Sequence, residues 1–212
     1  IMHKNVNNLI VIENLLKKKT NTEKLPQIIA VSKTFPSSDI IPLIEYGHSH
    51  FGENKIQEAI EKWTLIKKNF QNVKLHMIGK LQTNKVKFLF PLFDYLHSLD
   101  NLKLAKKISL EQHKSKKKLK IFIQVNIGNE DQKSGVNVSY LKEFYSICSK
   151  ELNLNIVGLM CLPPNDDKTK IYFSQVQKLN EELGLKELSL GMSGDFLEAT
   201  NVGSTFLRIG SK

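Results

Sequence analysis

Apolar residues recur along the chain with two spacings, one typical of short buried strands and one typical of amphipathic helices. Residues 4–19 have helical spacing, and short apolar runs then alternate with helical patterns to the end of the chain. The apolar runs predict strands at residues 27–32, 49–52, 74–78, 95–98, 120–126, 156–161, 187–190 and 205–209. The helical patterns cover residues 38–47, 53–69, 83–90, 101–114, 138–150, 166–184 and 195–202, with Ser37, Asn101 and Asp166 as expected N-terminal caps.

This alternation of strands and helices favours a closed barrel, because helical crossovers require parallel strands and eight such units can close on themselves. We predict an α/β fold, a TIM-type (β/α)8 barrel with an extra N-terminal helix, forming a single domain over residues 1–212. No internal repeat or low-complexity linker marks a second domain. An open, doubly wound sheet is the alternative, since the number of strands does not prove closure.

The composition is that of an ordinary globular protein, with 41% hydrophobic residues. No apolar run approaches the roughly 20 residues of a membrane span, and the first residues lack the order of a signal peptide. We therefore expect no membrane association and a cytoplasmic location. Cys148 and Cys161 form neither a CxxC pair nor a metal-ligand spacing with the six histidines, which predicts buried free thiols and no metal site.

The chain is basic, with a formal net charge of +10, which raises the question of nucleic-acid binding. The lysines are spread over the whole sequence, and the tight runs at residues 17–19 and 116–118 have no interleaved aromatic residues. A single-strand binding platform would need such residues for base stacking. We interpret the charge as a solvated basic surface, with no nucleic-acid partner.

One basic residue stands apart, because Arg208 is the only arginine among the 31 basic residues. Lysine evidently serves wherever a positive charge is sufficient, so the remaining guanidinium indicates a position that needs a planar fork of N–H donors. Arg208 lies in a β-prone run, next to Gly210 and Ser211. This pattern predicts a pocket for an anion or a heterocycle, and the alternative is an arginine retained by chance in a salt bridge.

Two glycine-containing turns offer a phosphate site. In a barrel of this kind, functional residues lie at the C-terminal ends of the strands and a phosphate binds in the loops after strands 7 and 8. Ser193 and Gly194 follow the seventh predicted strand, and Gly210 and Ser211 follow the eighth. Glycine lets a ligand approach the backbone N–H groups, and serine adds a hydroxyl donor. Ordinary helix capping would explain the first turn equally well.

Lys33 closes the first predicted strand, at the same end of the barrel. Low-dielectric surroundings would lower the pKa of a lysine there and make its amine nucleophilic toward an aldehyde. With so many lysines in the chain, this position alone is weak evidence. Together, the lysine, the phosphate loops and the arginine match the aldehyde carbon, the phosphate and the ring nitrogen of pyridoxal 5'-phosphate (PLP).

At these residues the chain resembles the pyridoxal phosphate homeostasis protein family, which is related to the N-terminal barrel domain of alanine racemase. The matches occur in the family's order and span most of the chain. The matching segments are Ala30-Val31-Ser32-Lys33-Thr34, Phe51-Gly52-Glu53-Asn54, Gln57-Glu58, His76-Met77-Ile78-Gly79, Leu81-Gln82-Thr83-Asn84-Lys85, Val125-Asn126-Ile127, Lys133-Ser134-Gly135, Gly158-Leu159-Met160, Gly191-Met192-Ser193-Gly194-Asp195 and residues 203–211.

The resemblance implies a barrel that binds PLP as a Schiff base on Lys33, with its ring nitrogen facing Arg208. The phosphate would lie on Ser193, Gly210 and Ser211, and Asn54 would line the pocket. Family members are thought to buffer PLP and to deliver it to PLP-dependent apoenzymes, and they are expected to be monomers.

Two departures from the family pattern stand out. Family chains usually continue after the Arg-Ile-Gly-Ser loop into a closing helix, which is expected to be missing here because the sequence ends at Lys212. Lys80 replaces a proline that is common in the family.

A PLP-dependent amino-acid racemase is the alternative function. Racemisation needs acid/base groups on both faces of the cofactor, and Lys33 could serve only one of them. No tyrosine is evident for the other face: Tyr95 opens a strand at the wrong end of the barrel, and the others fall in helical patterns, namely Tyr46, Tyr140, Tyr145 and Tyr172. His76 and His97 lie within strands, where packed imidazoles are expected. We therefore predict a cofactor-binding protein without catalytic residues.

Overall fold

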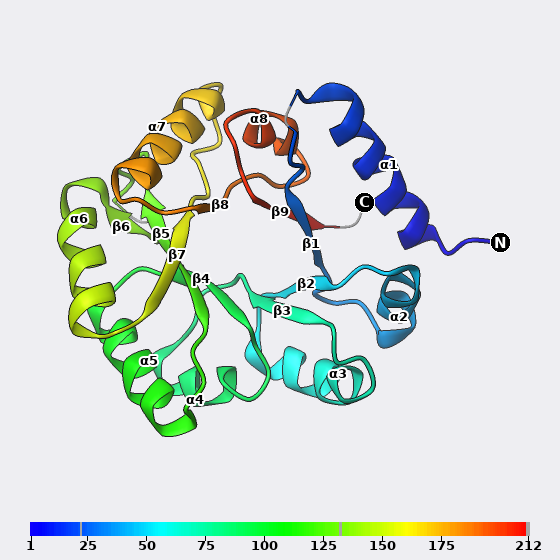
Figure 1. The fold of residues 1–212 in the computed structure, drawn as a ribbon, viewed down its shortest axis with the longest axis horizontal. Helices are drawn as coiled ribbons and strands as arrows, with labels where there is room; N and C mark the ends of the chain where they lie inside the picture. Colours follow the sequence, from blue (N-terminus) through cyan, green and yellow to red (C-terminus); the bar gives the residue numbers. More distant parts are fainter. Residues whose placement is uncertain (22, 132, 211–212) are drawn as a thin grey trace.

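The computed structural model describes residues 1–21, 23–131 and 133–210 of the chain. Within these residues, eight parallel strands close into a barrel with helices around its outside (Figure 1). The predicted TIM-type barrel is confirmed, and the open sheet is excluded. The barrel strands are β1 (Gln27–Val31), β2 (His50–Glu53), β3 (Lys74–Met77), β4 (Tyr95–Leu99), β5 (Lys120–Asn126), β7 (Asn155–Met160), β8 (Glu187–Ser189) and β9 (Phe206–Gly210).

Closure depends on two strand pairings. The strands follow the order β4-β3-β2-β1-β9-β8-β7-β5, and pairing of β4 with β5 completes the ring. The first and last strands lie side by side, with Val31 opposite Gly210. The C-terminal ends of β1 and β9 therefore adjoin each other. A further two-residue strand, β6 (Val136–Asn137), pairs with the end of β5 outside the ring.

The helices cover the outer face of the barrel, and α1, the predicted additional N-terminal helix, packs beside α2 (Figure 1). The helices are α1 (Lys4–Lys19), α2 (Ser37–Tyr46), α3 (Ile56–Asn69), α4 (Val86–Leu89), α5 (Leu102–Ser115), α6 (Val138–Ser146), α7 (Thr169–Glu182) and α8 (Phe196–Asn201). The main hydrophobic core lies between these helices and the strands and includes the fully buried Trp63 of α3. Burial of this apolar face is the main force that holds the helices against the barrel.

A second, smaller core fills the barrel interior, because alternate strand residues point inward. It is formed by Ile29, Tyr95, Phe122, Met160 and Phe206. The aromatic rings in this core also contact two fully buried histidines of β3 and β4, namely His76 and His97.

Several helix ends differ from the predicted ones. The helix predicted at residues 138–150 changes to a π-helix at Ile147–Glu151, and the one predicted at 83–90 begins as a 3-10 turn at Thr83–Lys85. The Asn101 side chain caps α5 as expected, since it accepts from the Leu104 N–H at 2.9 Å.

The two other predicted caps are wrong. Pro36 precedes α2, whose first helical residue is Ser37. Proline fixes φ near −65° and sets the helix entry at that point. Asp166 instead forms a turn by accepting from the Lys168 N–H at 2.8 Å, and α7 begins only at Thr169.

Both cysteines are buried and unpaired, as predicted. Burial raises the pKa of the Cys148 and Cys161 thiols to about 12. Both groups therefore stay protonated at neutral pH and are poor nucleophiles. Among the described helices, none combines the length and the apolar character needed to cross a membrane.

Candidate functional site

A cavity of about 980 Å³ lies at the C-terminal ends of the barrel strands. Its cationic lining residues are Lys33, Lys55, Lys80, Lys133 and Arg208. None of the described residues that line it is acidic. Such a concentration of one sign of charge in a concave site attracts anions.

The cavity brings together the predicted site residues that the structure describes. Lys33 follows β1, Asn54 follows β2, Ser193 lies in the loop after β8, and Arg208 and Gly210 belong to β9, and all of them line the cavity. Ser211, the remaining predicted residue, lies outside the described residues. Residues distant in the sequence therefore converge on one site because parallel strands end at the same rim.

The two predicted phosphate loops meet across the rim. The Ser193 hydroxyl lies 3.4 Å from the Gly210 carbonyl oxygen, and the Arg208 N–H donates to the Gly191 carbonyl at 2.9 Å. Among the described residues other than its chain neighbours, no heavy atom would lie within 4 Å of a Cβ atom added at Gly194 or Gly210. The space above both glycines is therefore open, so an anion could approach the backbone there.

Asn54 is held at the rim by close packing against Gly79, which follows β3. A Cβ atom on Gly79 would lie only 2.3 Å from the Asn54 carbonyl oxygen, so any larger residue would displace the backbone here. The Ile78 N–H donates to the Glu53 carbonyl at 3.0 Å and fixes the same pair of strand ends. Asn54 is half-buried and lines the cavity.

Lys33 differs from the expectation in one respect. Its side chain is exposed at the open rim, so the predicted low-dielectric surroundings are wrong. The strand ends at Val31, and the chain turns at Lys33 and Thr34, the latter in the left-handed region with φ of 65°. The turn carries the amine to the edge of the cavity and away from the apolar barrel interior.

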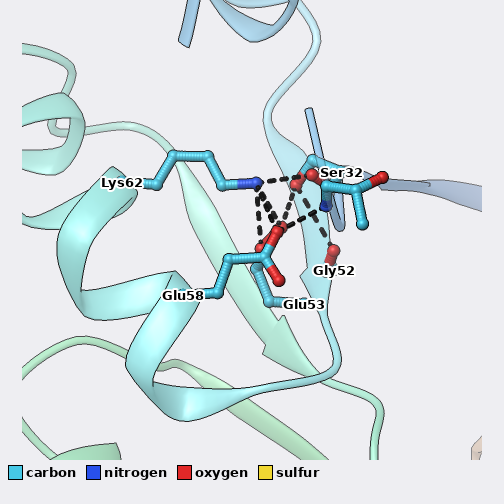
Figure 2. Close-up of polar contacts among 6 residues, drawn as sticks. Ser32, Gly52, Glu53, Glu58 and Lys62 are labelled. Carbon is cyan, nitrogen blue, oxygen red and sulfur yellow. Dashed lines mark hydrogen bonds and ion pairs between the residues drawn. The ribbon is translucent and has the colours of Figure 1, made fainter. Parts of the chain in front are cut away.

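The residues on both sides of Lys33 are held by a partly buried group of polar and charged side chains, the Lys62 cluster (Ser32, Glu53, Glu58 and Lys62; Figure 2). The Lys62 ammonium group lies 3.1 Å from Oε1 of Glu53 and donates to the Ser32 carbonyl at 2.5 Å. The Ser32 hydroxyl donates to Glu53 Oε2 at 2.5 Å. Glu58 accepts from the Thr34 N–H, and its carboxylate lies 3.4 Å from the Lys62 ammonium.

Arg208 is 4% exposed, and the protein uses only part of its donor capacity. Nη1 donates to the Ser189 carbonyl at 2.9 Å and to the Ser189 hydroxyl at 2.5 Å, and Nη2 donates to the Cys161 carbonyl at 3.1 Å. A guanidinium has five N–H groups. Two of them, the Nε–H and one on Nη2, make no hydrogen bond within the described part of the chain.

Some residues at or next to the candidate site escaped the sequence analysis. Lys62 was indistinguishable from the other lysines, although Glu53 and Glu58 lie in the segments that resemble the family. Gln124 of β5 also lines the cavity. The signal that could have found Lys62 is its spacing, because it lies one helical turn after Glu58.

The chain is similar in sequence to proteins of one known family. Residues 10–212 match the family model of the alanine racemase N-terminal domain. The pyridoxal phosphate homeostasis protein of Aquifex aeolicus is 34% identical over 209 residues, which are 94% of this chain and 91% of that protein. The Vibrio cholerae protein of the same name is 34% identical over 210 residues, 94% of this chain and 89% of that one.

A solved structure agrees with these relatives. PipY of Synechococcus elongatus, determined with PLP bound, superposes with a TM-score of 0.83 at 30% identity, over 94% of this chain and 97% of that one. The chain belongs to the pyridoxal phosphate homeostasis protein family.

Proposed function

We propose that this protein binds PLP in the cavity and serves in intracellular PLP homeostasis, as a monomeric cytoplasmic carrier that supplies PLP-dependent apoenzymes. The observation that carries the proposal is the convergence of Lys33, Asn54, Ser193, Arg208 and Gly210 on one cavity whose described lining is cationic and free of carboxylates. PLP is anionic, so this charge pattern suits it. The PLP-bound structure of PipY and the names of the relatives support the same function.

The covalent link is assigned to Lys33. PLP supplies an aldehyde carbon that condenses with a lysine amine to a Schiff base, with loss of one water molecule. Lys33 stands on a turn whose neighbours Ser32 and Thr34 are both fixed by the Lys62 cluster, so the backbone that carries the amine has a defined position. Ser193 and Gly210 are assigned to the phosphate, through the serine hydroxyl and the open backbone beside it, together with Ser211.

Arg208 is assigned to the ring nitrogen. A guanidinium is a donor only, so a ring nitrogen that accepts from it stays unprotonated. An unprotonated ring is a poor electron sink, which favours keeping the cofactor intact over using it in amino-acid chemistry. The relatives are named as homeostasis proteins and not as enzymes, which agrees with this assignment.

Borohydride reduction of the PLP-loaded protein, followed by peptide mapping, should place the label on Lys33. Lys33→Ala should lose the label and the visible absorption of the bound cofactor. Lys80→Ala is the matched control, because Lys80 lines the same cavity and its replacement removes the same charge. It should keep both signals.

Three other lysines line the cavity, so positive charge alone does not determine that the label will be on Lys33. Label on Lys55, Lys80 or Lys133 with none on Lys33 would reject the assignment of the covalent link. Absence of any PLP binding by the unmodified protein would reject the proposed function as a whole.

We expect the purified protein not to racemise alanine or serine above background. Tyr95 lies in the barrel interior, stacked on His76 at 4.1 Å between ring centroids, and no tyrosine is among the described residues that line the cavity. Lys33 would thus act without the tyrosine partner that racemisation of this type uses. Chiral analysis after long incubation tests this, and turnover that disappears in Lys33→Ala would favour the racemase.

A further inference from the structure

A continuous chain of hydrogen bonds crosses the barrel interior and ends at Arg208. His50 Nδ1 lies 2.9 Å from His76 Nε2, and His76 Nδ1 lies 2.8 Å from His97 Nε2. His97 Nδ1 lies 2.9 Å from the hydroxyl oxygen of Ser189, which accepts from Arg208 Nη1 at 2.5 Å. The chain thus links β2, β3, β4, β8 and β9 and connects the cavity to the opposite end of the barrel, where β2 begins at His50.

The interior of the barrel isolates this chain from water. His76, His97 and Ser189 are fully buried, and only His50 reaches partial exposure. The His76 ring stacks on Tyr95, and the His97 ring stacks on Phe122 with 4.4 Å between centroids. Among the described residues, the hydrogen-bond partners found for the His76 and His97 ring nitrogens are His50, Ser189 and each other, so the imidazoles depend on one another.

Burial also keeps the imidazoles neutral. It lowers the pKa of His50 to about 4 and those of His76 and His97 well below 6.5. The neighbouring positive charge of Arg208 lowers the pKa of His97 further. Around His50, the groups that add to this effect are His48, Lys74 and Lys120, and Asp94 opposes them.

The proton positions along the chain follow from Arg208. Its Nη1 can only donate, so the Ser189 oxygen accepts from it. Among the described residues, the Ser189 hydroxyl hydrogen then has one acceptor, His97 Nδ1. If His97 donated instead, this hydrogen would be buried without an acceptor, which is unfavourable.

The remaining protons are then determined one after another. His97 has its proton on Nε2 and donates to His76 Nδ1, and His76 likewise donates from Nε2 to His50 Nδ1. His50, also protonated on Nε2, ends the chain at its partly exposed position. Each imidazole is a neutral Nε2–H tautomer, and each hydrogen bond runs in the same direction.

We propose that Ser189, His97, His76 and His50 are positioning residues for Arg208. By holding the Ser189 hydroxyl hydrogen toward His97, the chain keeps the oxygen lone pairs available to Nη1 and so fixes the guanidinium plane. The Nε–H and one Nη2–H, which make no protein hydrogen bond among the described residues, are then presented to a ligand. This inference rests on the proposed function, because it assigns those donors to the ring of PLP.

The tautomers can be read by NMR without any cofactor. In protein labelled with ¹⁵N-histidine, two-bond proton–nitrogen spectra should show His50, His76 and His97 as neutral Nε2–H forms between pH 6 and 8. The His50 signals can be assigned by their loss in His50→Gln. This substitution changes only the partly exposed end of the hydrogen-bonded series and leaves the buried histidines in place. A protonated ring or an Nδ1–H form at His97 would overturn the proposed direction.

Ser189→Ala tests the positioning role. It should convert His97 to a mixture of tautomers, weaken PLP binding about tenfold and shift the absorption band of the bound cofactor, and Ser189→Thr should restore all three properties because it keeps the hydroxyl. Ser204→Ala is the control, since Ser204 is also buried beside β8 and β9, but among the described residues its hydroxyl hydrogen-bonds only to backbone groups of Leu188, Leu190 and Phe206. It should lower stability without changing the tautomers or the absorption band.

The outcomes separate this inference from the proposed function. If Ser189→Ala leaves PLP affinity and absorption unchanged while the unmodified protein binds PLP, the positioning role is wrong and the PLP function stands. If the unmodified protein does not bind PLP, the proposed function fails and the positioning role fails with it, whereas the tautomer spectra still decide the direction of the chain.

Discussion

Lys62→Met should lower the free energy of unfolding by about 3–5 kcal/mol, the typical cost of removing one partner from a buried ion pair. The Lys62 side chain is 8% exposed and that of Glu53 is fully buried, so the substitution leaves a carboxylate without its counter-charge in the protein interior. Methionine has nearly the shape of lysine, so little of the effect comes from lost packing. Urea-induced unfolding, followed by circular dichroism, measures the change.

Two further variants separate charge from other causes. Lys107→Met removes a less buried ion pair with Glu111 of α5, and Glu111 keeps the Lys114 ammonium at 3.5 Å, so this substitution should change stability much less. Adding Glu53→Gln to Lys62→Met should recover part of the loss, because the buried charge is removed as well. Equal stability losses in Lys62→Met and Lys107→Met would show that the Lys62 cluster does not stabilise the fold in the way described.

Arg208→Lys should weaken PLP binding about 100-fold, which corresponds to about 2.7 kcal/mol. The lysine keeps the positive charge but loses the planar fork, so the two N–H groups left for the ligand are no longer presented together. The cost of one or two charge-assisted hydrogen bonds is in this range. Titration of the folded variant with PLP, followed by visible absorption, measures the loss.

Lys55→Arg makes the reverse exchange at an exposed position in the lining of the same cavity and should leave affinity nearly unchanged. Arg208→Glu should raise the proton affinity of the ring nitrogen and permit slow side reactions with amino acids. Affinity of Arg208→Lys within about threefold of the unmodified protein, or a protonated ring nitrogen in the unmodified holoprotein by NMR, would contradict the assignment.

The sequence was informative wherever local patterning and burial agree. The strand at residues 120–126 has the predicted bounds because its largely apolar run is buried between neighbouring strands. The helix predicted from residue 53 starts only at Ile56, because Glu53 still belongs to β2 and its carboxylate is buried in the Lys62 cluster. A polar residue at a strand end is easily assigned to the next helix when its partner is unknown.

The sequence predicted the candidate site only in part. Arg208 was identifiable because its residue type is unique in the chain, and Lys33 because of its position after an apolar strand. The exposure of Lys33 depends on a turn with a positive φ at Thr34, which no local pattern indicated. The histidine chain depends on the tilt and register of separate strands, so the sequence predicted packed imidazoles at His76 and His97 without showing that they are connected to Arg208.

The open position of Lys33 has a consequence for how the cofactor would leave. A lysine enclosed by the barrel would release its cargo only after water or another amine had entered, and the rate would then depend on opening of the fold. At the rim, an amine from a recipient protein could approach the cofactor carbon that is bonded to Lys33 while every barrel strand stays paired. Release would therefore be governed by the concentration and geometry of the recipient, and a rigid barrel would be no obstacle to rapid exchange.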